Sequence, residues 1–301
     1  MKEMTKQKSI WLINPDKKIQ VNYLWSPSLG PSECTLLVLP GLDESIGDYH
    51  GFITRLIELF PHYSILAIDL RGQGATLDAE IKISGYNVPM KNQITIIKEI
   101  TNSLQIKSLF VVGLSYGAGV ALCAANQLVN IAGLALIATY VSKFKNFKRG
   151  LIGMWYTLIN LNPFNKTMAN YFLPLYFHMA RDKGLLNPKV TWSRNKLEAL
   201  TKLSTGILDI STDKESKLAH TLCLGVHLFI GEEDQVVSVS AVQQLFNELS
   251  CENKSMTIVP NLDHRLLVNN YNSCCEWMAK VLPNKVDLDL KSDLDGISKV
   301  V

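Results

Sequence analysis

Short apolar runs alternate with amphipathic segments along most of the chain. Residues 9–14 and 19–26 alternate apolar and polar side chains, which is typical of half-exposed strands. Apolar runs then predict buried strands at residues 34–40 and 64–70, and further strands at 108–114, 131–140, 226–231 and 255–260. Runs of this kind indicate strands that are covered on both faces.

Helical periodicity separates these strands. Residues 51–60 place their apolar side chains on one stripe, and the segment that begins at Pro89 repeats isoleucines at helical spacing. Further helices are expected directly after Ser115, near 239–249 and near 268–282. Strands that alternate with helices predict an α/β fold, with a mainly parallel central sheet and helices on both faces.

The alternation stops between residues 142 and 222, which read as helices and loops without a clear strand. We therefore expect a core made of residues 1–141 and 223–283, a helical cap or lid at 142–222, and a polar tail at 284–301. Ligands of such sheets bind at the carboxyl ends of the strands. The insertion leaves from that edge, where it can form a lid.

Composition narrows the function classes. The 301 residues are 47% hydrophobic and 19% charged, which supports a large core, and the net charge of +3 gives no reason to expect nucleic acid as a partner. No apolar leader follows the N-terminus, and the apolar stretch at 151–161 is too short to span a bilayer, so we expect a cytoplasmic protein. The six cysteines show no paired spacing, which argues against a disulfide framework or a zinc site.

One serine stands between two glycines where a predicted strand becomes a predicted helix. The spacing Gly113-x-Ser115-x-Gly117 suits a sharp turn that exposes the hydroxyl at a helix N-terminus, where negative charge is stabilised. Small flanking residues let the helix pack closely against the strands. The alternative interpretation is an ordinary glycine-rich turn.

Two downstream residues could activate this hydroxyl. Asp234 follows the strand at 226–231, and His264 follows the last strand. A serine needs a base, and the base needs a carboxylate that holds its tautomer. Glu232 and Glu233 are rivals for the carboxylate, whereas Asp263 adjoins the histidine and is poorly placed to reach its ring.

Five segments together resemble the motifs of α/β-hydrolase-fold serine hydrolases of the esterase and lipase type. They are LPGLDES (39–45), DLRGQGAT (69–76), GLSYG (113–117), GEEDQVV (231–237) and DHRLL (263–267). The resemblance covers about residues 20–282 and implies that Ser115 is the nucleophile, His264 the base and Asp234 the orienting acid. It further implies an oxyanion hole from the amides of Leu42 and Tyr116, and no metal or organic cofactor.

Some positions depart from the family pattern. Pro40-Gly41 stands where His-Gly is frequent, Gln73 where histidine is common, and Leu114 where histidine or asparagine is common. A backbone amide serves the oxyanion, so we expect these packing positions to tune activity and not to abolish it. Asp69 and Arg71 are interpreted as a structural pair that stabilises a turn.

The predicted cap has an unusual composition. Residues 143–181 contain no Asp or Glu, but six Lys or Arg side chains and nine aromatic ones. The aromatic side chains either bury a helical cap on the core or line a lid over an acyl-chain pocket. In the second interpretation the basic rim favours an anionic head group or a phospholipid surface, and the protein contacts the membrane peripherally.

The sequence therefore predicts a serine hydrolase that cleaves a lipophilic carboxylic ester or thioester through an acyl-enzyme. One alternative is an acyltransferase that passes the acyl group to a hydroxyl acceptor, similar to the hydroxyacyl-chain synthases of this fold. Another is a non-catalytic binding protein on the same fold. Dehalogenase and epoxide hydrolase chemistry is disfavoured, because those enzymes need an aspartate at the position of Ser115.

Overall fold

The computed structural model describes residues 8–14, 17–32, 34–42, 44–76, 90–125, 127–128, 130–139, 225–234 and 236–282. The predicted cap at 142–222 and the predicted tail at 284–301 lie outside these ranges, and so does Pro89. The division into core, cap and tail therefore stays a prediction. Within the described ranges, no helix has both the length and the apolar character needed to cross a bilayer.

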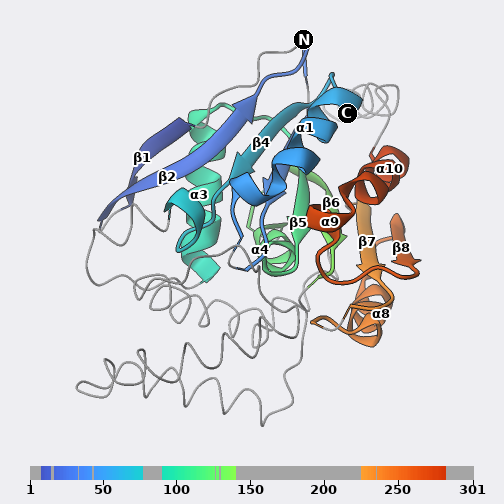
Figure 1. Ribbon diagram of the computed structural model, residues 1–301. Helices are drawn as coiled ribbons and strands as arrows, with labels where there is room; N and C mark the ends of the chain where they lie inside the picture. Colours follow the sequence, from blue (N-terminus) through green and yellow to red (C-terminus); the bar gives the residue numbers. More distant parts are fainter. Residues whose placement is uncertain are drawn as a thin grey trace, which may run out of the picture.

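Eight strands form one sheet in the order β1-β2-β4-β3-β5-β6-β7-β8 (Figure 1). Their bounds are β1 Lys8–Asn14, β2 Lys17–Ser26, β3 Thr35–Leu39, β4 Ser64–Ile68, β5 Leu109–Leu114, β6 Ile131–Ile137, β7 Gly225–Gly231 and β8 Lys254–Val259. All neighbours from β4 to β8 pair in parallel, whereas β1 and β2 add an antiparallel edge. The expected mainly parallel sheet is confirmed.

Helices cover both faces of this sheet (Figure 1). They are η1 Ile46–Tyr49, α1 His50–Leu59, α3 Met90–Ser103, α4 Tyr116–Ala125, α8 Val239–Glu248, α9 Leu266–Asn269 and α10 Tyr271–Val281. The single last helix predicted near 268–282 is wrong in one respect. The chain forms two helices there, because the backbone of Asn270 (φ −143°, ψ 39°) leaves the helical region between them.

Strand β3 shows how the core is divided between the two faces. Its alternate residues Leu37 and Leu39 join the apolar cluster that includes α3, α4 and α8. Leu36 and Val38 point to the other face and join the cluster of α1 and α10. Both faces of β3 are thus buried, which explains why the central strands read as continuous apolar runs and not as alternating ones.

Candidate active site

Ser115 lies in the turn between β5 and α4, in a conformation that few non-glycine residues adopt. Its φ angle is +49°. The turn is fixed from both sides, since Ser115 N donates a hydrogen bond to Ile137 O on β6 at 2.8 Å and Ser115 O accepts one from Gly119 N at 3.2 Å. A strained residue persists only where its surroundings determine its conformation, as they do here.

The two glycines around Ser115 allow close packing of the helix on the strands. A Cβ atom at Gly113 would lie 2.6 Å from the Cα atom of Ala118. One at Gly117 would lie 2.5 Å from the carbonyl oxygen of Pro40. Both distances are shorter than any real Cβ contact, so these positions require glycine, for the packing reason expected from the sequence.

The loops that follow β7 and β8 are held together. Glu233 N donates a hydrogen bond to Leu262 O at 3.0 Å, and Glu232 N donates one to Val259 O at 2.9 Å. Gly231 makes this approach possible, because a Cβ atom there would lie 2.6 Å from the carbonyl carbon of Leu262. The loop that carries Asp234 therefore lies beside the loop that carries His264.

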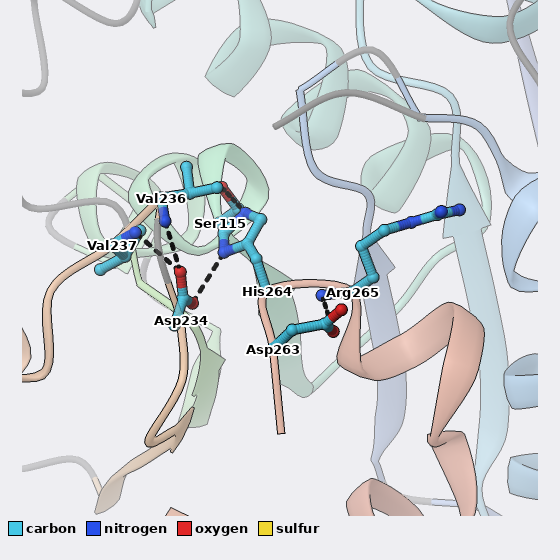
Figure 2. Close-up of polar contacts among 7 residues, drawn as sticks. All are labelled: Ser115, Asp234, Val236, Val237, Asp263, His264 and Arg265. Carbon is cyan, nitrogen blue, oxygen red and sulfur yellow. Dashed lines mark hydrogen bonds and ion pairs between the residues drawn. The ribbon is translucent and has the colours of Figure 1, made fainter. Parts of the chain in front are cut away.

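The three predicted side chains meet at the carboxyl edge of the sheet (Figure 2). His264 Nδ1 lies 2.7 Å from Asp234 Oδ2, and His264 Nε2 lies 3.1 Å from Ser115 Oγ. The Asp234 side chain is fully buried, whereas the His264 side chain is 15% exposed. The imidazole thus bridges a buried carboxylate and a hydroxyl.

Asp234 is held in place by the backbone that follows it. Its Oδ1 atom accepts hydrogen bonds from Val236 N at 2.9 Å and from Val237 N at 2.8 Å (Figure 2). Its Oδ2 atom remains directed at the imidazole. An ionised carboxylate can only accept, so His264 Nδ1 carries the proton and Nε2 of the neutral ring is left as an acceptor that faces Ser115.

The rival carboxylates do not take this place. Glu232 and Glu233 are exposed to solvent. Asp263 turns away from the neighbouring ring, and its Oδ1 atom accepts a hydrogen bond from Arg265 N at 2.9 Å (Figure 2). Asp234 is therefore the carboxylate that the structure brings to His264.

The segment predicted to complete an oxyanion hole lies next to the start of α4. The first turn of α4 packs against the carbonyl oxygens of Leu39 and Pro40, and Leu42 follows two residues later. Tyr116 is the first residue of α4, where backbone N–H groups have no acceptor within the helix. The role of the two amides stays a prediction, but their elements are adjacent.

Buried polar groups support this segment. The Asp69 carboxylate accepts hydrogen bonds from Ile46 N, Ala75 N and Asn22 Nδ2 at 2.7, 2.9 and 2.7 Å. Asp69 thereby ties the turn after β4 to the start of η1, in agreement with the structural role expected of it. Arg71 takes part through its backbone, because its N and O atoms both bond to the Gln93 side chain at 2.8 Å.

A second support was not predicted from the sequence. The Tyr49 hydroxyl accepts a hydrogen bond from Gly41 N at 3.0 Å and donates one to the Glu44 carboxylate. Burial raises the pKa of Glu44, against the opposing effects of the Tyr49 hydrogen bond and of His264. No sequence signal marks Tyr49, since its ring reads as one more apolar residue.

The described part of the chain contains no group of three or more His, Cys, Asp or Glu side chains that could hold a metal ion. The side chains at the carboxyl edge instead form a line from carboxylate to imidazole to hydroxyl. Such a line can move a proton from the hydroxyl to the imidazole while the carboxylate stabilises the charged ring.

The chain is similar to a known family of hydrolases. A family model described as "Serine aminopeptidase, S33" matches residues 30–270. No curated protein sequence matches the chain. Solved structures with the same fold share 15–17% sequence identity with this chain, a level that establishes the fold alone.

Three solved structures illustrate that fold. An α/β-hydrolase enzyme from a Medee basin deep-sea metagenome library has a TM-score of 0.64 at 17% identity, over 89% of this chain and 98% of that one. An esterase of Thermogutta terrifontis has a TM-score of 0.62 at 15% identity, over 92% of this chain and 99% of that one. A monoacylglycerol lipase of Paleococcus ferrophilus has a TM-score of 0.59 at 16% identity, over 87% of this chain and 99% of that one.

Proposed function

The chain belongs to the α/β-hydrolase family described as serine aminopeptidase S33, and from this premise we propose that it is a serine hydrolase of carboxylic esters or thioesters. The observation that carries the proposal is the position of His264, with Nδ1 on Asp234 and Nε2 on Ser115. A serine hydroxyl is a weak nucleophile, and this contact supplies the base that it needs.

The reaction proceeds in two half-reactions. His264 takes the Ser115 proton as Oγ attacks the carbonyl carbon, and it then protonates the departing alcohol or thiol. Water attacks the resulting acyl-enzyme with His264 again as base, which releases the acid and restores Ser115. Asp234 holds the ring in the tautomer that both steps require and stabilises the imidazolium.

Negative charge on the former carbonyl oxygen needs donors that are already in place. The amides of Leu42 and Tyr116 are assigned this role, because their segments lie together beside Ser115. Donors of this kind usually supply the largest electrostatic contribution to acyl transfer, since they need not reorganise during the reaction.

A lipophilic acyl group is the substrate class that we favour. The aromatic and basic segment at 143–181 supports it from the sequence, although this segment lies outside the described residues. The structural neighbours include an esterase and a monoacylglycerol lipase, which is consistent with an ester substrate.

Labelling with a fluorophosphonate tests the proposal directly. The reagent phosphonylates a base-activated serine with loss of fluoride, and peptide mass spectrometry then locates the adduct. We expect the adduct on Ser115, and no labelling of the Ser115→Ala variant at equal Tm. Labelling at another residue, or unchanged ester hydrolysis by Ser115→Ala, would overturn the mechanism.

A substrate panel tests the reaction class. We expect turnover of p-nitrophenyl esters, with kcat/KM rising from acetate to octanoate. Turnover of aminoacyl p-nitroanilides without turnover of esters would contradict the ester assignment while leaving the role of Ser115 intact.

A further inference from the structure

We propose that Gln73 is a positioning residue that aims the Leu42 amide at the oxyanion. The inference rests on the proposed function, because it concerns the oxyanion hole of the same site. Gln73 is 1% exposed and lies in the turn after β4, at a position that the sequence marked only as a packing position. Its side-chain amide Nε2 donates a hydrogen bond to Gly41 O at 2.9 Å.

The argument depends on the geometry of one peptide group. Gly41 O and Leu42 N belong to the same planar unit, and in a trans peptide the C=O and N–H bonds point in opposite directions. A donor that holds Gly41 O on one side therefore fixes the direction in which the Leu42 N–H points. Gln73 holds the side away from the predicted oxyanion.

Gln73 is itself rigidly placed. Its backbone N donates to Leu70 O at 3.1 Å, which closes the turn. Gly74 follows with φ +57°, and a Cβ atom there would collide with the Asp69 carboxylate. That carboxylate also accepts the Ala75 and Ile46 amides. The glutamine side chain thus extends from a buried turn that cannot easily shift.

The other contacts of Gly41 leave a distinct task for Gln73. The Tyr49 hydroxyl accepts from Gly41 N, which belongs to the preceding peptide group. Glu44 N donates to Gly41 O at 3.3 Å, a longer bond than that from Gln73. Without Gln73, the Gly41–Leu42 peptide would retain this weaker restraint. Donation to the carbonyl also polarises the peptide and strengthens its N–H as a donor.

The test compares wild type with Gln73→Leu, using p-nitrophenyl butyrate as substrate and phenylboronic acid as inhibitor. The boronate forms a tetrahedral adduct on a reactive serine and so reports on oxyanion binding. We expect kcat to fall about 10- to 100-fold with KM within about twofold, because an oxyanion contact acts in the transition state. The boronate inhibition constant should rise in proportion to the loss of kcat/KM.

Gln73→Glu supplies a readout that a purely structural role would not move. An ionised carboxylate repels Gly41 O, whereas a protonated one can donate a hydrogen bond to it. The ratio of the Gln73→Glu rate to the wild-type rate should therefore rise as pH is lowered from 8 to 6. A ratio that stays constant over this range would contradict the proposal.

Thr76→Val is the matched control. Thr76 is also a buried polar residue that follows β4, 0% exposed, and its hydroxyl bonds to Asn22 N and Asp69 O and not to Gly41. We expect Thr76→Val to lower Tm, with kcat within about threefold of wild type. Equal losses of kcat in both variants would assign Gln73 to stability alone and overturn the inference.

Failure of this inference can be told apart from failure of the proposed function. If Ser115→Ala is inactive but Gln73→Leu turns over substrate at the wild-type rate, Gln73 has no positioning role, and the proposal that the protein is a serine hydrolase is retained. If Ser115→Ala keeps its activity, the proposed function falls, and the inference falls with it.

Discussion

The carboxylate beside His264 is the residue on which the site depends most clearly. Asp234→Asn replaces an acceptor by an amide that can also donate, so the ring is free to adopt the wrong tautomer. We expect kcat for ester hydrolysis to fall by about 10⁴-fold without loss of Tm. Glu233→Gln, at the exposed neighbouring position, should change kcat by less than about twofold. A larger effect at Glu233 would show that the wrong acid had been assigned.

Replacement of Gly117 should affect stability. A Cβ atom there meets backbone carbonyls of residues 39 and 40, which cannot move aside as a flexible side chain can. We expect Gly117→Ala to lower the free energy of unfolding by about 1–3 kcal/mol, measured by urea denaturation. In Gly47→Ala the new atom would lie 3.5 Å from Ser45 Oγ, an ordinary contact, so that variant should be near neutral.

The sequence predicted the site residues that follow the ends of strands. It did not predict the residues that act by holding a backbone peptide group. Ser115, Asp234 and His264 each lie in the segment that follows a strand of the sheet, so their meeting follows from a parallel sheet. The family resemblance had favoured Asp234 over Glu232 and Glu233, and the side-chain directions agree with that choice. The bond from Gln73 to Gly41 crosses 32 residues without any spacing rule, and the sequence indicated nothing more than packing there.

Helix α8 carries a prediction that concerns one element. The side chain of Ser238, its N-cap residue, accepts a hydrogen bond from Ala241 N. Ser238→Ala leaves that N–H unpaired by the cap and should cost about 1 kcal/mol of unfolding free energy in urea. Ser240→Ala removes the hydroxyl that donates to Ser238 Oγ at 3.2 Å but keeps the cap bond from Ala241 N, and alanine is favourable inside a helix, so this variant should be near neutral. A loss at Ser240 equal to that at Ser238 would argue against the cap.

Element type was predicted better than element ends. The strands at 34–40 and 64–70 are buried as predicted, and the other predicted strands and the amphipathic helices also form, although β8 at the sheet edge is only partly buried. The division between α9 and α10 was missed. Leu266 and Leu267 are buried with α10, so the apolar pattern runs through the break at Asn270 and does not reveal it.

The burial of two cysteine thiols lets us predict how easily the native fold opens. Burial is the largest cause that raises the pKa of Cys34 to about 11 and that of Cys275 to about 12. A raised pKa keeps both thiols protonated, and therefore unreactive, at pH 8. We expect iodoacetamide to spare both in the native protein and to modify both in 8 M urea, as read by peptide mass spectrometry. Rapid modification of the native protein would show that the face covered by α1 and α10 opens easily.

At the scale of the whole sheet, the sequence indicated parallel strands but not their order. The order places β5 in the interior and β8 at the edge, and it depends on which strands pair across long connections. The antiparallel edge of β1 and β2 was visible only as two alternating segments. Strand pairing between distant segments is a property of the folded chain, and local periodicity does not encode it.

The contact between Ser115 and His264 joins residues that are 149 positions apart, and the histidine follows the last strand, at the edge of the sheet. A chain that grows from its N-terminus on the ribosome displays Ser115 long before His264 has been translated. The nascent protein would thus carry its serine without a base and be chemically silent toward cellular esters. Catalytic competence would appear only after β8 has docked, so a fluorophosphonate-reactive Ser115 would report that synthesis has passed residue 264.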